Sequence, residues 1–153
     1  MTNLIFGVNI EEKVSEELAD CVAIVTDSNV NALYPKLTEN AIEIPAGENS
    51  KTAETLLSVI DGFAARGVAR NDVIAAVGGG VVGDIAGLAA ALYMRGIDWI
   101  NVPTTLLAMA DAGIGGKTAI DRFGVKNSIG AFHFPRRTVI SFAFTDTLDE
   151  REW

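Results

Sequence analysis

Short apolar runs alternate with longer amphipathic stretches along most of the chain. Runs that are β-branched or continuously apolar predict strands at residues 21–26 (CVAIVT), 41–44 (AIEI), 72–77 (DVIAAV), 97–102 (IDWINV) and 138–141 (TVIS). Continuous apolar runs such as 72–77 are typical of strands that are covered on both faces of a parallel sheet. The pattern therefore favours buried strands separated by covering helices.

Two of the intervening stretches carry a clear helix pattern. One buried helix face is predicted by apolar residues at helical spacing: Leu56, Leu57, Ile60, Phe63 and Ala64. Ser50 or Thr52 can cap the start of this helix, and Gly67 can end it. A second helix is predicted over 82–95, and its Ala and Leu residues on most sides indicate deep burial.

The order of these elements predicts an α/β fold: a Rossmann-like parallel sheet with helices on both faces, forming one domain over residues 1–153. Residues 111–132 hold five glycines among polar and charged residues, and we expect an irregular, functional segment there. The last nine residues, TDTLDEREW, read as the beginning of a helix with Thr147 as its cap and Glu150 three positions on. We expect a longer protein to continue beyond Trp153.

Composition and charge narrow the function classes. No apolar run approaches the roughly 20 residues of a membrane helix, and the first residues lack the pattern of a secretory signal. A net charge of −8 argues against nucleic acid as a partner. Cys21 is the sole cysteine, which is consistent with a small core residue in a reducing, cytoplasmic protein. His133 is the sole histidine, so one copy of this chain cannot supply two histidine ligands to a metal. A packing role is therefore expected for His133.

A glycine motif follows the run 72–77. Residues 78–83 (GGGVVG) fit G-x-G-x-x-G between a predicted strand and a predicted helix, where a bare backbone and a helix N-terminus can hold a diphosphate. The motif follows a later strand than usual, and no acidic residue ends a strand about 20 positions on. A glycine-rich turn needed only for packing stays open as the alternative.

A larger set of sequence blocks resembles one family. In order, the chain contains AGENSK (46–51), GGGVVGD (78–84), YMRG (93–96), VPTTLLA (102–108), GGKT (115–118) and KNSIGAFHFP (126–135). These blocks closely resemble the N-terminal half of 3-dehydroquinate synthases, which are sugar phosphate cyclases. The ending TLDEREW is similar to the family's segment just before its first metal-ligating glutamate. The resemblance thus implies that the family's C-terminal helical metal-binding domain lies outside this chain.

The resemblance also implies site residues. Positions that match NAD contacts are Asp27, Glu48, Lys51, Gly79, Gly80, Val81, Val82, Gly83, Asp84, Thr104, Thr105, Lys126, Phe144, Thr145, Asp146 and Thr147. Asp111, Lys117 and Asn127 match substrate contacts, and Arg95 matches an arginine that reaches the substrate phosphate of the neighbouring subunit, which implies a homodimer. Taken singly, these lysines and Arg95 could be solvated charges, Thr104 and Thr105 a helix cap, and Asp84 a partner of the helix dipole.

The implied activity is that of a lyase of the shikimate pathway. It uses NAD, with zinc or cobalt bound by ligands beyond this chain, to convert 3-deoxy-D-arabino-heptulosonate 7-phosphate, a sugar acid phosphate, into 3-dehydroquinate and phosphate. This chain alone is expected to be inactive because it lacks the metal ligands. The chain departs from the family pattern at Ala46, at Asp149 and in the block Ala110-Asp111-Ala112-Gly113, which ends in the triplet Asp-Ala-Gly. The triplet is closer to cyclases that use sedoheptulose 7-phosphate. A 2-epi-5-epi-valiolone or 2-deoxy-scyllo-inosose synthase, or a stand-alone nucleotide-binding module, therefore stays open.

Overall fold

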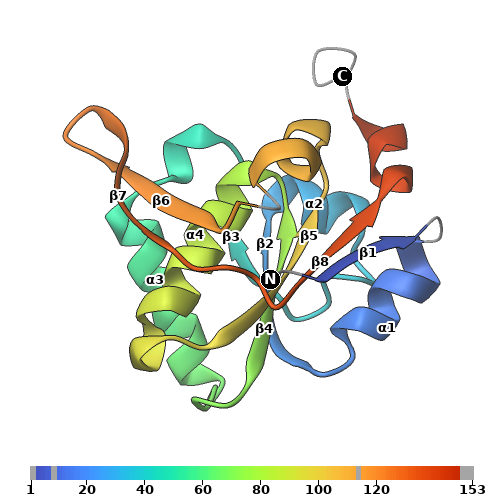
Figure 1. The fold of residues 1–153 in the computed structure, drawn as a ribbon, viewed down its shortest axis with the longest axis horizontal. Coiled ribbons are helices and arrows are strands. Elements are labelled where there is room, and N and C mark those ends of the chain that lie inside the picture. Colours follow the sequence, from blue (N-terminus) through green and yellow to red (C-terminus); the bar gives the residue numbers. More distant parts are fainter. Residues whose placement is uncertain (1–2, 8–9, 113–114, 149–153) are drawn as a thin grey trace.

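The computed structural model describes residues 3–7, 10–112 and 115–148, and its main feature is a parallel sheet between two layers of helices (Figure 1). The sheet has six strands in the order β1-β8-β5-β4-β2-β3, and every pairing in it is parallel. Its strands are β1 (Asn3–Gly7), β2 (Cys21–Asp27), β3 (Ile42–Ile44), β4 (Val73–Gly78), β5 (Asp98–Pro103) and β8 (Arg137–Ser141). The α-helices are α1 (Ser15–Leu18), α2 (Ser28–Leu33), α3 (Ala53–Ala65) and α4 (Gly80–Leu92). The structure confirms the predicted α/β class and each strand predicted from the sequence.

Both faces of the sheet are buried, as the continuous apolar run of β4 predicted. Ile74 and Ala76 belong to the core that α3 and α4 cover. Ala75 and Val77 belong to a second core on the opposite face, which also contains Leu18 of α1. Because successive side chains of a strand point to opposite faces, one apolar run serves both cores.

The helix α3 begins at the predicted cap, and three of its five predicted core residues, Leu56, Ile60 and Phe63, pack into the core. The Thr52 hydroxyl accepts a hydrogen bond from the backbone N–H of Thr55, which confirms the cap. Phe63 is fully buried, whereas Leu57 is 58% exposed and Ala64 is also exposed, so these two were wrongly assigned to the core. Val59, which was not among the predicted core residues, is buried between Leu56 and Phe63 on this face. The helix ends as expected, with Gly67 at φ +66°.

The helix α4 is shorter than its Ala-rich sequence indicated. It ends at Leu92, and a 3₁₀ turn (Tyr93–Arg95) follows in which Met94 and Arg95 have positive φ. Left-handed backbone cannot continue an α-helix, so the helix stops three residues before the predicted end. Gly87 explains how closely α4 packs, because a Cβ there would lie 2.4 Å from the Thr118 Cγ2 atom.

The glycine-rich segment 111–132 is largely a β-hairpin, and the prediction that it is irregular was wrong. Strands β6 (Lys117–Arg122) and β7 (Val125–Phe132) pair antiparallel, and the hairpin packs on the outer side of α4. A two-residue turn joins them, with φ of 53° at Phe123 and 75° at Gly124. Positive φ at both turn residues is the geometry of a tight hairpin turn, for which glycine is suited. Each residue of β7 is exposed, so this strand has no buried apolar face from which the hydrophobic pattern could predict it.

Two terminal features also differ from the sequence-based expectation. The strand β1 was not predicted, although it contains the short apolar run Leu4-Ile5-Phe6, and it pairs with β8 at the edge of the sheet. Residues Phe142–Thr147 form a 3₁₀ helix that ends with Thr147, whereas the sequence had suggested a helix beginning there; Glu150 lies outside the described residues. The remaining turns are a 3₁₀ turn at Glu48–Ser50 and π-helical turns at Ile10–Val14 and Ala108–Ala112. None of the described helices is both long and apolar enough to span a membrane.

Candidate functional site

The carboxyl ends of β2, β4 and β5 meet at one edge of the sheet, and a cavity of about 630 Å³ lies there. In α/β proteins this edge is where ligands bind, between a strand's end and the following helix. The cavity is bounded by α2, the beginning of α4, the turn after β5 and the C-terminal 3₁₀ helix. Its lining residues include Asp27, Tyr34, Gly79, Gly80, Val81, Thr104, Thr105, Thr147 and Leu148.

The beginning of α4 offers bare backbone to this cavity. Gly79 is the N-cap residue of the helix and no side chain caps it. A Cβ at Gly80 would meet no atom within 4 Å, so the space beside this residue is open. The first N–H groups of a helix lack intrahelical acceptors and carry a partial positive charge, which suits an anion. The residues that the glycine motif predicted thus leave room for an anion at this helix start, and binding of a diphosphate here stays a prediction.

Not every glycine of the motif serves this cradle. Gly78 is needed for packing, because a Cβ would lie 2.5 Å from the Cγ2 atom of Val82. The Gly83 N–H donates to the Gly79 carbonyl within the helix, and Val82 is fully buried. The packing interpretation of the motif thus applies to Gly78, whereas Gly79, Gly80 and Val81 line the cavity, as the ligand-binding interpretation requires.

An acidic residue lies on the strand next to β4, although none follows the motif at the usual distance. Asp27 ends β2, which pairs with β4. Its Oδ1 atom accepts hydrogen bonds from the N–H groups of Asn29 and Val30, each at 2.9 Å, and so caps α2. Within the described residues no partner is seen for Oδ2, which leaves this oxygen for a hydroxyl group in the cavity. A ribose hydroxyl fits this acceptor.

Thr104 and Thr105, which line the cavity, also form hydrogen bonds within the fold. The Thr104 N–H donates to the Gly78 carbonyl at 2.9 Å, and the Thr105 hydroxyl accepts from the Ala108 N–H at 3.3 Å. Thr105 is therefore a helix cap, as its position after a proline had suggested, and it lines the cavity as well. A ligand contact by either threonine stays a prediction.

The C-terminal 3₁₀ helix brings one of its four predicted NAD residues to the cavity lining, and the assignment of the other three stays a prediction. Thr147 lines the cavity, and its hydroxyl is 3.0 Å from the hydroxyl of Tyr34. Phe144 and Thr145 are buried behind it, with the Phe144 ring packed edge-on at 5.1 Å from Tyr34, while Asp146 is exposed. Tyr34 was missed by the sequence analysis, since an isolated tyrosine in a loop carries no pattern.

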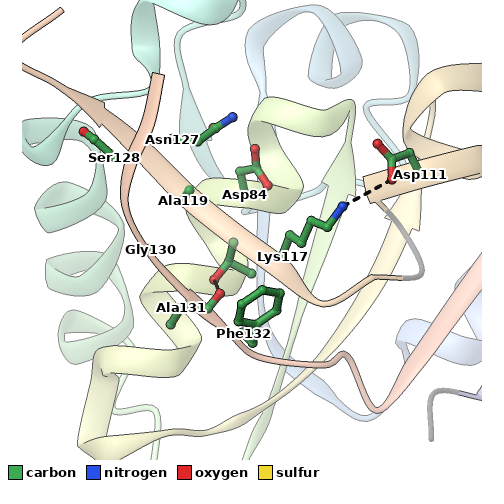
Figure 2. Close-up of a pocket in the computed structure, with 10 residues that line it drawn as sticks. Asp84, Asp111, Lys117, Ala119, Asn127, Ser128, Gly130, Ala131 and Phe132 are labelled. Carbon is green, nitrogen blue, oxygen red and sulfur yellow. Dashed lines mark hydrogen bonds and ion pairs between the residues drawn. The ribbon is translucent and has the colours of Figure 1, made fainter. Parts of the chain in front are cut away.

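A second cavity, of about 480 Å³, lies between α4 and the β6–β7 hairpin (Figure 2). It brings together Asp84 and the three residues that the sequence assigned to substrate: Asp111, Lys117 and Asn127. The Lys117 Nζ atom is 3.8 Å from Asp111 Oδ1, and the two side chains are 66% and 72% exposed. Such an exposed, long ion pair contributes little to stability, so Lys117 can exchange Asp111 for an anionic ligand.

Lys51 lies behind this cavity as a buried link between elements. It is only 5% exposed, and its Nζ atom is 2.5 Å from both Asp84 Oδ2 and Asn127 Oδ1. Its carbonyl also accepts a hydrogen bond from the Asp121 N–H at 3.0 Å. Burial raises the pKa of Asp84, and the Lys51 ammonium opposes that rise by favouring the carboxylate. The assignment of Lys51 and Asp84 to NAD stays a prediction.

Other predicted site residues lie apart from both cavities. Glu48 and Lys126 form an ion pair at 3.2 Å over a third hollow between α3 and the hairpin turn. Arg95 is exposed at the end of α4 opposite to Gly80, and it lines none of the three cavities described here. The expected packing role of His133 is confirmed, since its Nε2 atom is 2.8 Å from the Ile97 carbonyl and its own carbonyl accepts from Trp99 Nε1.

Comparison with known proteins agrees with this arrangement. The family described as 3-dehydroquinate synthase N-terminal matches residues 41–153. A 3-dehydroquinate synthase from Geotalea uraniireducens is 44% identical over an alignment of length 148 that covers 90% of this chain and 41% of that protein. The chain thus spans less than half of the length of this relative.

Two solved cyclases share the fold. A 2-epi-5-epi-valiolone synthase from Streptomyces hygroscopicus, solved with NAD⁺ and Zn²⁺, superimposes with a TM-score of 0.93 at 34% identity, over 99% of this chain and 46% of that one. A 2-deoxy-scyllo-inosose synthase, solved with carbaglucose-6-phosphate, NAD⁺ and Co²⁺, gives 0.82 at 29% identity, over 99% and 46% of the two chains. With a family match that covers most of its length, the chain belongs to the 3-dehydroquinate synthase N-terminal family.

Proposed function

We propose that this chain is the NAD-binding part of a 3-dehydroquinate synthase, a lyase of the shikimate pathway. The observation that supports it most is the open space beside Gly80 at the uncapped start of α4, in a chain of this family. The 44% identity to a 3-dehydroquinate synthase supports the substrate, which is 3-deoxy-D-arabino-heptulosonate 7-phosphate. The products are 3-dehydroquinate and phosphate.

The residues of the first cavity fit NAD. A diphosphate is an anion with several acceptor oxygens, and Gly80 and Val81 present backbone to it at a helix N-terminus. Asp27 offers a carboxylate oxygen to a ribose hydroxyl, and Thr104 and Thr105 close the cavity on the side of β5. When bound, NAD would supply a hydride acceptor for the oxidation of a secondary alcohol of the substrate, and its reduced form would supply the hydride for the later reduction. The chain's own task is to hold the dinucleotide rigidly.

The second cavity is the proposed place of the sugar acid phosphate. Lys117 supplies a positive charge that is bound to Asp111 only by a long, exposed ion pair. Asn127 supplies an amide from β7. Because Asp84 and Asp111 also line this cavity, we expect an oxygen-rich substrate with both hydroxyl and anionic groups, rather than a simple anion. These groups bind and orient the substrate.

The proposed enzyme also needs a metal site and a neighbouring subunit. The described residues contain no group of three His, Cys, Asp or Glu side chains that could hold a metal ion. We therefore place the zinc or cobalt ligands in the part of the protein that the relatives have in addition to this chain. The exposed position of Arg95, away from the cavities, suits a residue that acts on the neighbouring subunit of a homodimer in the cytoplasm.

Phosphate release tests the proposal. This chain joined to a metal-binding second part should release phosphate from the heptulosonate phosphate in the presence of NAD and zinc or cobalt, and the chain alone should not. A panel with sedoheptulose 7-phosphate and glucose 6-phosphate separates the sister cyclases, which the triplet at 111–113 keeps as candidates. Turnover of one of these in place of the heptulosonate would transfer the assignment to that cyclase. Turnover by the chain alone would contradict the two-part scheme.

A further inference from the structure

The Lys51 ammonium contacts the side chains of Asp84 and Asn127, and both of these residues line the second cavity, which is the proposed substrate cavity. Lys51 is 5% exposed, so its charge needs partners inside the protein. Asp84 of α4 provides the counter-charge, and Asn127 of β7 provides a neutral oxygen at 2.5 Å. Asp84 balances the charge, and Asn127 accepts from a second of the three N–H donors of the ammonium. Because the Asn127 side chain also lines the substrate cavity, this hydrogen bond restrains a group that lies beside the substrate.

An ammonium group can only donate hydrogen bonds, and this decides which end of the Asn127 amide faces it. The carboxamide oxygen accepts from Lys51, so the NH₂ group, at the other end of the planar amide, points away from the ammonium. Among the described residues this NH₂ group has no acceptor within hydrogen-bond distance. The backbone of Asn127 is fixed as well, with φ at 54° and its N–H donating to Asp121 Oδ1 at 2.7 Å.

We infer that Lys51 is a positioning residue for substrate: it holds the Asn127 amide so that its NH₂ group donates to an acceptor oxygen in the cavity. The inference rests on the proposed function only for the identity of the substrate. It differs from the role that the family resemblance implies for Lys51, which is contact with NAD. Lys51 does not line the cavity beside Gly80, whereas both of its side-chain partners line the substrate cavity.

The orientation of Asn127 can be measured without any ligand. In ¹⁵N-labelled chain, we expect the Asn127 side-chain NH₂ signal to show an order parameter above about 0.8 in the wild type and below about 0.6 in Lys51→Met. Lys36→Met, which removes an exposed lysine, is the matched control and should leave the signal unchanged. An equally rigid amide in Lys51→Met would overturn the inference, whatever the substrate is.

The consequence for substrate is measured in the chain joined to its metal-binding part. Lys51→Met should raise KM for the heptulosonate phosphate by about tenfold or more, while the NAD Kd from calorimetry stays within about twofold. Asn127→Asp keeps a partner for Lys51 but replaces the donor with an anion, so it should raise KM at least as much. If Lys51→Met instead weakens NAD and leaves KM unchanged, Lys51 acts on the cofactor and the inference is wrong. A wild-type KM in Asn127→Asp would contradict it too.

Discussion

Gly80→Ala should separate cofactor binding from folding. The added Cβ would meet no protein atom within 4 Å, so the substitution introduces no clash. Alanine is the better helix former by up to about 1 kcal/mol, and we expect the free energy of unfolding to stay the same or to rise by that amount. The same methyl group would occupy the space into which the NAD diphosphate has to approach.

The loss of affinity follows from the cost of overpacking a fitted contact. Overpacking costs about 1–3 kcal/mol, and each 1.4 kcal/mol of binding free energy is a factor of about ten in Kd. NAD should therefore bind roughly 5- to 150-fold more weakly to Gly80→Ala. Isothermal titration gives the Kd, and urea unfolding gives the stability of the same variant. Gly78→Ala is the contrast, because its Cβ would lie 2.5 Å from Val82 and should destabilise the fold. Unchanged NAD affinity in a stably folded Gly80→Ala would refute the reasoning.

Three further outcomes test the packing and the electrostatics. Phe63→Ala should lower the free energy of unfolding by about 3–5 kcal/mol in urea titrations, whereas Leu57→Ala, at a 58% exposed position, should cost less than about 1 kcal/mol. Burial raises the pKa of Asp84 in the folded state above its value in the unfolded state, so the folded protein binds the carboxyl proton more tightly. The free energy of unfolding should therefore fall as the pH rises from the unfolded-state pKa to the folded-state pKa. Carboxyl ¹³C titration should show a still higher Asp84 pKa in Lys51→Met, and an unchanged value would exclude Lys51 as the opposing charge. Burial raises the pKa of the Cys21 thiol from 9.0 to about 11. Iodoacetamide at pH 8 should therefore label Cys21 about 100-fold more slowly than a free thiol of pKa 9.0. Labelling at the rate of the free thiol would contradict the burial of Cys21.

The parallel sheet could be predicted because its strands are continuously apolar. The run 72–77 needs cover on both faces, and the structure gives it cores on both sides. The β6–β7 hairpin could not be predicted in this way, since β7 is exposed along its whole length and carries no apolar alternation. Leu57 fitted the helical spacing of α3 as well as Phe63 did, and only the direction in which α3 packs on the sheet distinguishes them.

The motif blocks predicted many residues of the candidate site, but they did not predict that these residues line two separate cavities. The glycine motif located the beginning of α4 correctly, because backbone without side chains at a helix start has few other uses. The resemblance assigned Lys51 and Asp84 to the dinucleotide, and that assignment stays a prediction. Contacts between residues 76 positions apart, such as that of Lys51 with Asn127, depend on how the hairpin folds back over α4.

The central claim is that the start of α4 holds the NAD diphosphate, and an NMR titration of the ¹⁵N-labelled chain with NAD tests it most directly. We expect saturable shifts of the backbone amide signals of Gly80 and Val81, together with Thr104, and much smaller shifts in the β6–β7 hairpin. Shifts confined to the hairpin, or no saturable shifts at millimolar NAD, would contradict the account.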